Sequence, residues 1–147
     1  MDYSNYHLIT MNYHLALNTT ADVENFALKA KAGKSPSHVM WEISQVLKAK
    51  IHQPVNVEVL PKDRKLAKII GFPECWSLAR QLSEQLDDND VIYCDGEHLG
   101  VCIAAVCSQK QKRPKIAVLF HNINRPKGYL ALNALKVRNS NDIFETG

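Results

Sequence analysis

Short apolar runs and longer amphipathic stretches alternate along nearly the whole chain, and this alternation limits the choice of fold more than any other feature. Apolar runs of roughly four to eight residues are typical of buried strands, and apolar residues three or four positions apart are typical of helices packed on a sheet. Repeated alternation of the two predicts βαβ units on a parallel sheet, with helices on both faces. With 147 residues, the chain has the length of one domain.

Five apolar or alternating runs are predicted to form strands, and they comprise residues 7–11, 55–60, 90–94, 115–120 and 142–144. Polar and apolar side chains alternate most regularly in residues 55–60, whereas residues 115–120 are almost continuously apolar. We expect a mostly parallel five-stranded sheet in the order 3-2-1-4-5, joined by right-handed crossovers.

Apolar residues recur with helical spacing in four stretches between these strands: residues 37–50, 73–86, 100–107 and 128–137. The first stretch follows Ser35 and Pro36, a pair that helix starts favour because serine caps free N–H groups and proline suits the first turn. The third stretch is apolar on nearly all sides, which indicates a helix pressed against the sheet.

Residues 12–33 are predicted to form an inserted segment. A connection between a strand and a helix usually needs roughly two to six residues, and this one is far longer. Thr19 and Asp22 form a capping signal, which is followed at helical spacing by Val23, Phe26, Ala27 and Ala30. We therefore expect a small extra helix there. The segment is either a functional insertion or a surface elaboration, and its position does not decide between them.

The cysteines and the apolar content point to a reduced environment without a membrane span. Cys75, Cys94, Cys102 and Cys107 lack the paired short spacing of zinc or thiol-exchange motifs, and the six histidines show no ligand spacing, so no metal site is predicted. We expect the cysteines to be reduced core residues, which favours the cytoplasm. No stretch approaches the roughly 18 apolar residues of a transmembrane helix, and no signal peptide is visible.

The charge is distributed unevenly along the chain. Residues 1–107 contain 10 basic and 13 acidic residues, whereas residues 108–147 contain 8 basic and 2 acidic residues. The carboxyl-terminal part should therefore attract anions. Only Phe120 and Tyr129 lie among these basic residues, so we expect no nucleic-acid partner. Peripheral association with an anionic membrane, or binding of a nucleotide diphosphate, stays open.

Polar residues follow the third and fourth predicted strands. Asp95, Glu97 and His98 come after residues 90–94, and His121 and Asn122 come after residues 115–120. Because the carboxyl ends of parallel strands meet at one edge of a sheet, these side chains should gather on one rim. His121 could hydrogen-bond a sugar hydroxyl or a phosphate oxygen. The first three residues form either a general-base cluster or a polar turn with Asp95 as a helix cap.

Gly33, Lys34 and Ser35 form a second candidate site. A glycine, a cation and free N–H groups at a helix start together suit a phosphate. The same residues also suit an ordinary helix cap, and the full spacing of a P-loop is absent.

Three segments of the chain resemble family 4 glycosyltransferases. Residues 33–43, GKSPSHVMWEI, are similar to the glycine-bearing turn and first helix of that family. Residues 90–100, DVIYCDGEHLG, are similar to its third strand and polar loop, and residues 114–122, PKIAVLFHN, to its fourth strand with a terminal histidine. The resemblance implies a Rossmann-like fold, namely the amino-terminal, acceptor-binding half of the two-domain GT-B architecture. It also implies retaining transfer of a sugar from a nucleotide sugar, with no other cofactor.

The resemblance further implies roles for the candidate residues. Gly33, Lys34 and Ser35 would approach the donor diphosphate, and His121 would face the transferred sugar as the catalytic residue. The acceptor side would be lined by Asp95, Glu97, His98 and Asn122.

The chain lacks the donor-side signature of the family, a pair of glutamates with seven residues between them. We therefore expect an acceptor-side domain that is inactive alone and is completed by a donor-domain chain, or that forms a homo-oligomer through its rim. The alternative is a non-enzymatic Rossmann-like module that binds an anionic ligand or a partner protein.

Overall fold

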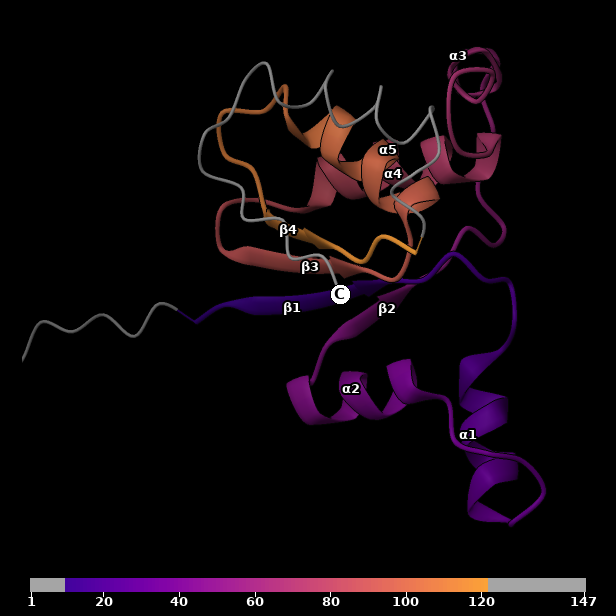
Figure 1. The fold of residues 1–147 in the computed structure, drawn as a ribbon. Helices are drawn as coiled ribbons and strands as arrows, with labels where there is room; N and C mark the ends of the chain where they lie inside the picture. The colour runs from indigo at the N-terminus through magenta and orange to yellow at the C-terminus, as the bar shows by residue number, and fades with distance from the viewer. Residues whose placement is uncertain (1–9, 122–147) are drawn as a thin grey trace, which may run out of the picture.

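The computed structural model describes residues 10–121, which form a parallel α/β fold. Within this range the sheet has the order β2-β1-β3-β4, with β1 (Asn12–Ala16), β2 (Lys50–His52), β3 (Asp90–Cys94) and β4 (Lys115–Val118). Figure 1 shows α1 (Val23–Lys31) and α2 (Val39–Leu47) below the sheet, and α4 (Pro73–Gln85) and α5 (Glu97–Cys107) above it. The short α3 (Pro61–Leu66) lies beside α4. The predicted class, a parallel sheet with helices on both faces, is confirmed.

The order of the strands differs from the predicted one. β3 pairs with β1 on one side and with β4 on the other, so the expected position of residues 90–94 beyond residues 55–60 is wrong. Residues 55–60 form no strand, because Asn56 has a positive φ of 56° that interrupts extended backbone. The strand beside β1 is instead β2, of which only the first residue, Lys50, fell within a predicted helix and the other two within no predicted element.

β1 is a central strand of the sheet, and its carboxyl-terminal residues are buried on both faces. Leu15 packs in the core on the α2 side, and Ala16 packs in the core on the opposite side. The prediction placed this strand at residues 7–11, but Thr10 and Met11 are not in a strand and residues 7–9 lie outside the described residues. The error arose because Asn12 and His14 give the true strand a polar appearance.

Residues 12–33 are therefore not an insertion between the first strand and the first helix. They contain β1 itself, a connection of ordinary length over residues 17–22, and α1. The predicted small helix is confirmed as α1. Its N-cap is Asp22, whose side chain accepts a hydrogen bond from the Asn25 N–H at 2.9 Å.

The predicted helix boundaries are corrected in two places. α2 begins at Val39 with His38 as N-cap, so Ser35 is not the cap residue. It ends early because Lys48 adopts a left-handed conformation with φ 52°, which releases the chain into β2. α5 begins at Glu97, three residues before the predicted start, and α4 begins at Pro73 as predicted. The predicted helix at residues 128–137 and strand at 142–144 lie outside the described residues.

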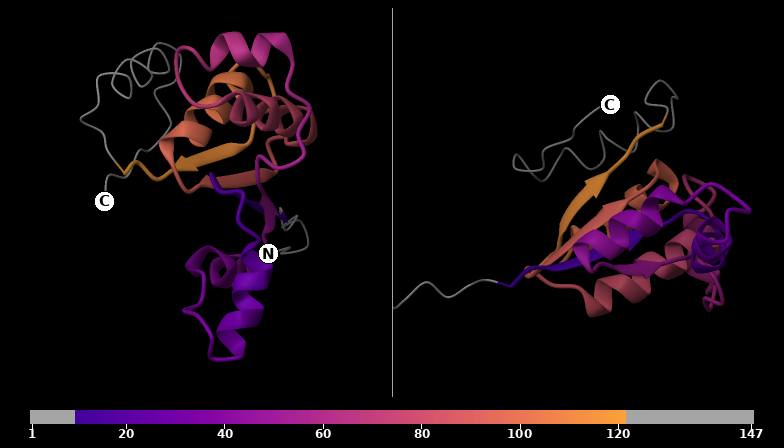
Figure 2. Two further views of the ribbon diagram at one scale, coloured as in Figure 1. Left: turned by 90° about the vertical axis from the view of Figure 1, so that its right-hand side faces the viewer. Right: turned by 90° about the horizontal axis from the view of Figure 1, so that it is seen from below.

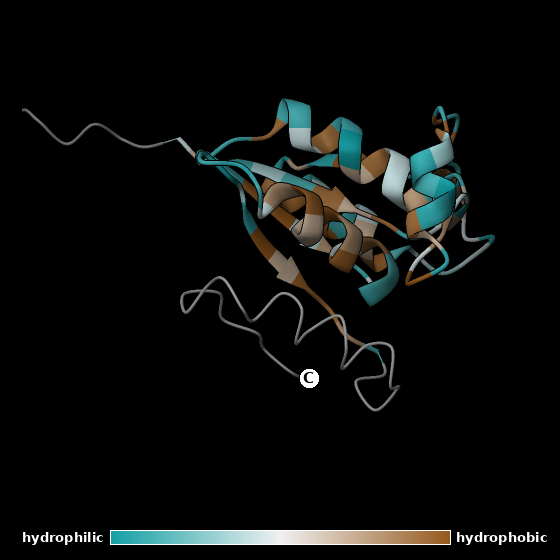
Figure 3. Ribbon diagram, turned by 90° about the horizontal axis from the view of Figure 1, so that it is seen from above, coloured by the Kyte–Doolittle hydropathy of each residue, from teal (hydrophilic) through white to brown (hydrophobic). Residues whose placement is uncertain are grey.

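Two hydrophobic layers hold the sheet between its helices. The larger layer joins the sheet to α4 and α5 and includes Leu78, Leu82, Ile92 and Ile103, and the smaller layer joins it to α1 and α2 through Leu15, Leu17, Val23 and Met40. Figure 3 shows α5 brown along most of its length and α4 brown on one side only. Cys75, Cys94, Cys102 and Cys107 are all buried and free, as predicted.

α5 lies unusually close to β4, and a glycine makes this approach possible. A Cβ atom added to Gly100 would lie 2.4 Å from Cγ1 of Val118. Since real Cβ atoms do not approach other carbons so closely, only glycine fits here without movement of α5 or β4. The close packing fixes the start of α5 beside the end of β4.

Candidate functional site

The connections of the sheet reverse direction at one point. The chain passes from β1 to β2 on one side, and then returns past β1 to β3 and β4 on the other side (Figure 1). In parallel α/β sheets, ligands bind outside the carboxyl ends of the strands at such a reversal. The segments that leave β1 and β3, residues 17–22 and 95–96, therefore mark the place to look for a site.

Asp95 links the segment that follows β1 to the segment that follows β3 through hydrogen bonds. Its carboxylate Oδ1 accepts a hydrogen bond from the Asn18 N–H at 2.7 Å, and its own N–H donates to the Ala16 carbonyl at 3.1 Å. The N-cap of α5 is Gly96, so Asp95 is not the helix cap that one interpretation expected. Its carboxylate instead shapes the loop that follows β1.

Glu97 is the first residue of α5 and carries an ionised carboxylate. Its Oε2 accepts a hydrogen bond from the His121 N–H at 3.2 Å. Burial alone would raise the pKa of Glu97, but hydrogen bonds from the backbone N–H groups of Glu97 and His121 and the nearby imidazoles of His98 and His121 outweigh it. The pKa of Glu97 is consequently lowered from its ordinary value.

His121 is exposed and lies directly after β4, with its ring close to Gly96. Its Nε2 lies 2.7 Å from the Asp95 carbonyl oxygen. A carbonyl oxygen only accepts hydrogen bonds, so Nε2 carries the proton and Nδ1 is the acceptor nitrogen of the neutral ring. We call Asp95, Glu97 and His121 the carboxyl-edge cluster. The structure thus brings together three of the residues that the sequence predicted.

His98 lies beside this cluster. It follows Glu97 on α5, and its ring packs against Phe72 with a centroid separation of 5.6 Å and an interplanar angle of 53°. Its Nδ1 is buried without a hydrogen-bond partner. His98 therefore contributes an aromatic contact on the side of α5 that faces the start of α4. Asn122 lies outside the described residues.

Gly33, Lys34 and Ser35 are placed away from the carboxyl-edge cluster. Figures 1 and 2 show the connection between α1 and α2 at the end of α1 that is farther from the sheet. Gly33, with φ 69°, ends α1: its N–H donates to the Ala30 carbonyl and the Lys34 N–H donates to the Lys29 carbonyl, each at 2.9 Å. The N–H groups of Gly33 and Lys34, which were predicted to bind a phosphate, thus already donate to carbonyls of α1. An anion contact at these residues stays a prediction.

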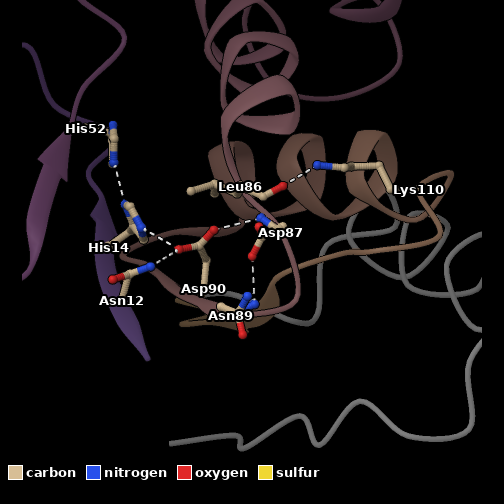
Figure 4. Close-up of polar contacts among 8 residues, drawn as sticks. All are labelled: Asn12, His14, His52, Leu86, Asp87, Asn89, Asp90 and Lys110. Atoms are coloured by element: carbon tan, nitrogen blue, oxygen red, sulfur yellow. Dashed lines mark hydrogen bonds and ion pairs between the residues drawn. The ribbon is translucent and has the colours of Figure 1, made fainter. Parts of the chain in front are cut away.

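A second polar cluster lies on the strands themselves, and the sequence analysis did not find it. His14 Nε2 lies 3.2 Å from Asp90 Oδ1, and His14 Nδ1 lies 2.9 Å from His52 Nε2 (Figure 4). We call Asp90, His14 and His52 the histidine chain. It links β3, β1 and β2. One feature of the sequence does indicate part of this cluster. Asn12 and His14 are two residues apart, so in a strand both lie on the same face.

Asp90 is the hydrogen-bond acceptor at one end of the histidine chain. Asp90 also accepts from Asn12 Nδ2 at 3.0 Å and from the Asp87 N–H at 2.7 Å, so its carboxylate is ionised. His14 then donates from Nε2 to Asp90, and one hydrogen bond joins its Nδ1 to His52 Nε2.

Two pKa shifts accompany the histidine chain. Burial, His14 and Lys50 lower the pKa of His52 to about 4. Burial alone would raise the pKa of Asp90, but hydrogen bonds from Asp87, Asn12 and His14 outweigh it and lower the pKa. Both shifts favour the hydrogen-bonded arrangement in which His52 is neutral and Asp90 is charged.

Among residues 10–121, no group of three or more His, Cys, Asp or Glu side chains is arranged to hold a metal ion. No helix within the same residues is long and apolar enough to cross a membrane. Comparisons of the chain with protein families, curated proteins and solved structures find no match.

Proposed function

We propose that this chain is the acceptor-side domain of a retaining glycosyltransferase of the GT-B type. The observation that carries the proposal is the hydrogen bond between the backbone of His121 and the carboxylate of Glu97, which lies directly after the β3 segment at which the strand connections reverse. Ligand sites of open α/β sheets lie at this place. The resemblance of residues 90–100 and 114–122 to that family supplies the reaction class.

The carboxyl-edge cluster has groups suited to sugar hydroxyls. An ionised Glu97 carboxylate accepts hydrogen bonds strongly, and the His121 ring can accept at Nδ1 when neutral or donate there when protonated. Such a pair can orient an acceptor hydroxyl. Transfer itself needs donor and acceptor held together, so catalysis requires a donor-binding half supplied by another chain or domain.

The alternative, a non-enzymatic module for an anionic ligand, is less well supported at this site. The amino end of α5 would be the natural place for an anion, because its N–H groups and helix dipole favour negative charge. The carboxylate of Glu97 already lies there and is ionised. A second negative group would be repelled, whereas a neutral hydroxyl would not.

The location and partners of the domain belong to the same proposal. Four buried free cysteines favour the cytoplasm, where thiols stay reduced. We expect a donor-domain chain, or a second copy, to cover the carboxyl-edge cluster. Peripheral membrane association through the basic carboxyl-terminal part is compatible with this assembly, and a nucleic-acid partner is not expected.

The test is a ligand titration followed by NMR on the full chain. Methyl glycosides should shift the amide signals of residues 95–98 and 121, and uridine diphosphate alone should not. Glu97→Gln and His121→Ala should each weaken glycoside binding, whereas Glu84→Gln, an exposed carboxylate near the far end of α4, should not. Shifts with the nucleotide and none with glycosides would favour the anion-binding module.

A transferase assay tests the second part of the proposal. The chain alone should not turn over nucleotide sugars with a glycoside acceptor. Robust turnover that is abolished by His121→Ala would contradict the need for a donor half.

A further inference from the structure

Phe72 is a large aromatic side chain that the fold leaves in solvent beside the candidate site. It is the N-cap residue of α4, and 53% of its surface is exposed. Its ring lies against His98, the residue that follows Glu97 on α5. The exposed ring thus contacts the residue next to Glu97, and the Glu97 carboxylate accepts the hydrogen bond from the His121 N–H.

The backbone that carries Phe72 is tightly fixed. Gly71 has φ 74°, and a Cβ atom there would lie 2.8 Å from Cys102 Sγ and 2.9 Å from the His98 carbonyl oxygen. The Phe72 carbonyl accepts hydrogen bonds from the N–H groups of Cys75 and Trp76. The Trp76 indole N–H also donates to the Ile70 carbonyl at 2.8 Å. The turn is thus held by contacts to α4 and α5, and the ring is presented at a defined place.

The Phe72 ring and the carboxyl-edge cluster, which are linked through His98 and Glu97, together offer both kinds of group that a sugar needs. A pyranose presents C–H groups on a ring face and hydroxyls around its rim. Binding sites for such ligands combine an aromatic surface with a few placed polar groups. Phe72 offers the apolar surface, and Glu97 and His121 offer the polar groups.

We infer that Phe72 is the platform on which the C–H face of the acceptor sugar packs, and that the acceptor group is a pyranoside. This inference rests on the proposed function, because it assigns the ligand class of the same site. Phe72 is then a specificity-determining residue: it selects a ring with an apolar face over an acyclic polyol that carries the same hydroxyls.

The test uses four variants of the full chain and two probes. The probes are methyl β-D-glucopyranoside and the acyclic polyol sorbitol, titrated by saturation-transfer NMR. Phe72→Tyr keeps the ring, whereas Phe72→Leu and Phe72→Ala remove it. Ile69→Ala is the matched control, because Ile69 is another exposed apolar residue of the same turn, with 68% of its surface exposed. Thermal unfolding of each variant confirms that it is folded.

We expect the glycoside to receive saturation at its ring C–H protons and sorbitol to receive none. Removing the ring with Phe72→Leu or Phe72→Ala should weaken glycoside binding about fivefold or more, the size expected for loss of an aromatic contact. Phe72→Tyr and Ile69→Ala should stay within about twofold of the original chain, as changes at exposed positions usually do.

The outcomes separate the two proposals. The glycoside can bind the original chain with shifts in the amide signals of residues 95–98 and 121, and bind Phe72→Leu and Phe72→Ala equally well. In that case the role of Phe72 as a packing surface is wrong and the proposed function stands. If sorbitol binds as well as the glycoside, the pyranoside specificity is wrong. If the glycoside does not bind the original chain at all, both proposals are wrong.

Discussion

The histidine chain and the carboxyl-edge cluster both combine carboxylate and histidine side chains, but in opposite settings. Asp90 and His14 are strand residues whose side chains are only 8% and 13% exposed, and the parallel register of β2, β1 and β3 brings the histidine chain together. Asp95, Glu97 and His121 lie in a loop, at a helix start and after a strand, and His121 is exposed. The strand residues hold the sheet together, whereas the loop residues are open to a ligand.

This contrast predicts that variants of the histidine chain change stability and that variants of the carboxyl-edge cluster change binding. Hydrogen bonds between shielded groups are costly to lose, because their partners remain without water. Groups at an exposed edge are solvated when a partner is removed.

Asp90→Ala should have the largest effect. Asp90 is 5% exposed and accepts hydrogen bonds from Asn12, His14 and the Asp87 N–H. Its removal leaves these donors without an acceptor, and we expect the free energy of unfolding to fall by about 3 kcal/mol. Urea unfolding followed by circular dichroism measures this change. Asp88→Ala, at an exposed neighbouring position, is the control, and equal losses for both variants would contradict the structural role of Asp90.

Gly100→Ala should disturb the carboxyl-edge cluster and leave the histidine chain in place. The new methyl group would press on Val118 and push α5 from β4, which separates Glu97 from His121. We expect a loss of about 2 kcal/mol, as for other overpacked sites.

A second substitution tests that cause. The clashing atoms of Val118 are its two γ carbons, so Gly100→Ala combined with Val118→Ala should lose less stability than the sum of the two single variants. Strict additivity of the losses would show that the two residues do not meet.

The pH dependence of stability should report the histidine chain. The pKa of His52 in the folded chain is about 4, below the ordinary histidine value of 6.5, so the unfolded chain binds more protons between these values. Stability should therefore fall as the pH is lowered from about 6.5 to about 4, by about 1 kcal/mol for a partly solvated group. The lowered pKa of Asp90 adds a further loss only at still lower pH.

His52→Gln tests the origin of this slope. The amide can still donate to His14 but does not titrate. Unfolding curves at pH 7.5 and pH 5 should differ less for the variant than for the original chain. An unchanged difference would assign the pH dependence to other groups.

Glu97→Gln should have the smallest effect on stability. Glu97 is half-buried at the solvent edge, and glutamine keeps an acceptor for the His121 N–H. We expect a change within about 0.5 kcal/mol by urea unfolding. The same variant weakens glycoside binding in the proposed function, so a large loss of stability together with unchanged binding would reverse the contrast between the two clusters.

The sequence predicted the elements whose pattern is locally clear. Residues 90–94 and the helix that begins at Pro73 have strong apolar periodicity, and the structure confirms both. The rule that ligands gather at carboxyl ends of strands placed Asp95, Glu97 and His121 on one edge, where they do meet.

The errors concern features that depend on tertiary partners. The alternation of polar and apolar residues over 55–60 predicts a strand. The positive φ of Asn56 interrupts the extended backbone there, and the polar and apolar pattern does not indicate that φ. The histidine chain could not be derived from the sequence because His14 and His52 meet only when β1 and β2 are known to be neighbours. The strand order likewise depends on burial of both faces of β1.

The positions of the four cysteines make thiol labelling a measure of local opening in this fold. All four lie in the larger hydrophobic layer, on α4, β3 and α5, and burial raises the pKa of each thiol. Since only a thiolate reacts with alkylating reagents, labelling must wait until this layer opens. The rate of alkylation of the native chain therefore measures the opening of the hydrophobic layer beside α4 and α5. Opening confined to the layer beside α1 and α2, which contains no cysteine, leaves this rate unchanged.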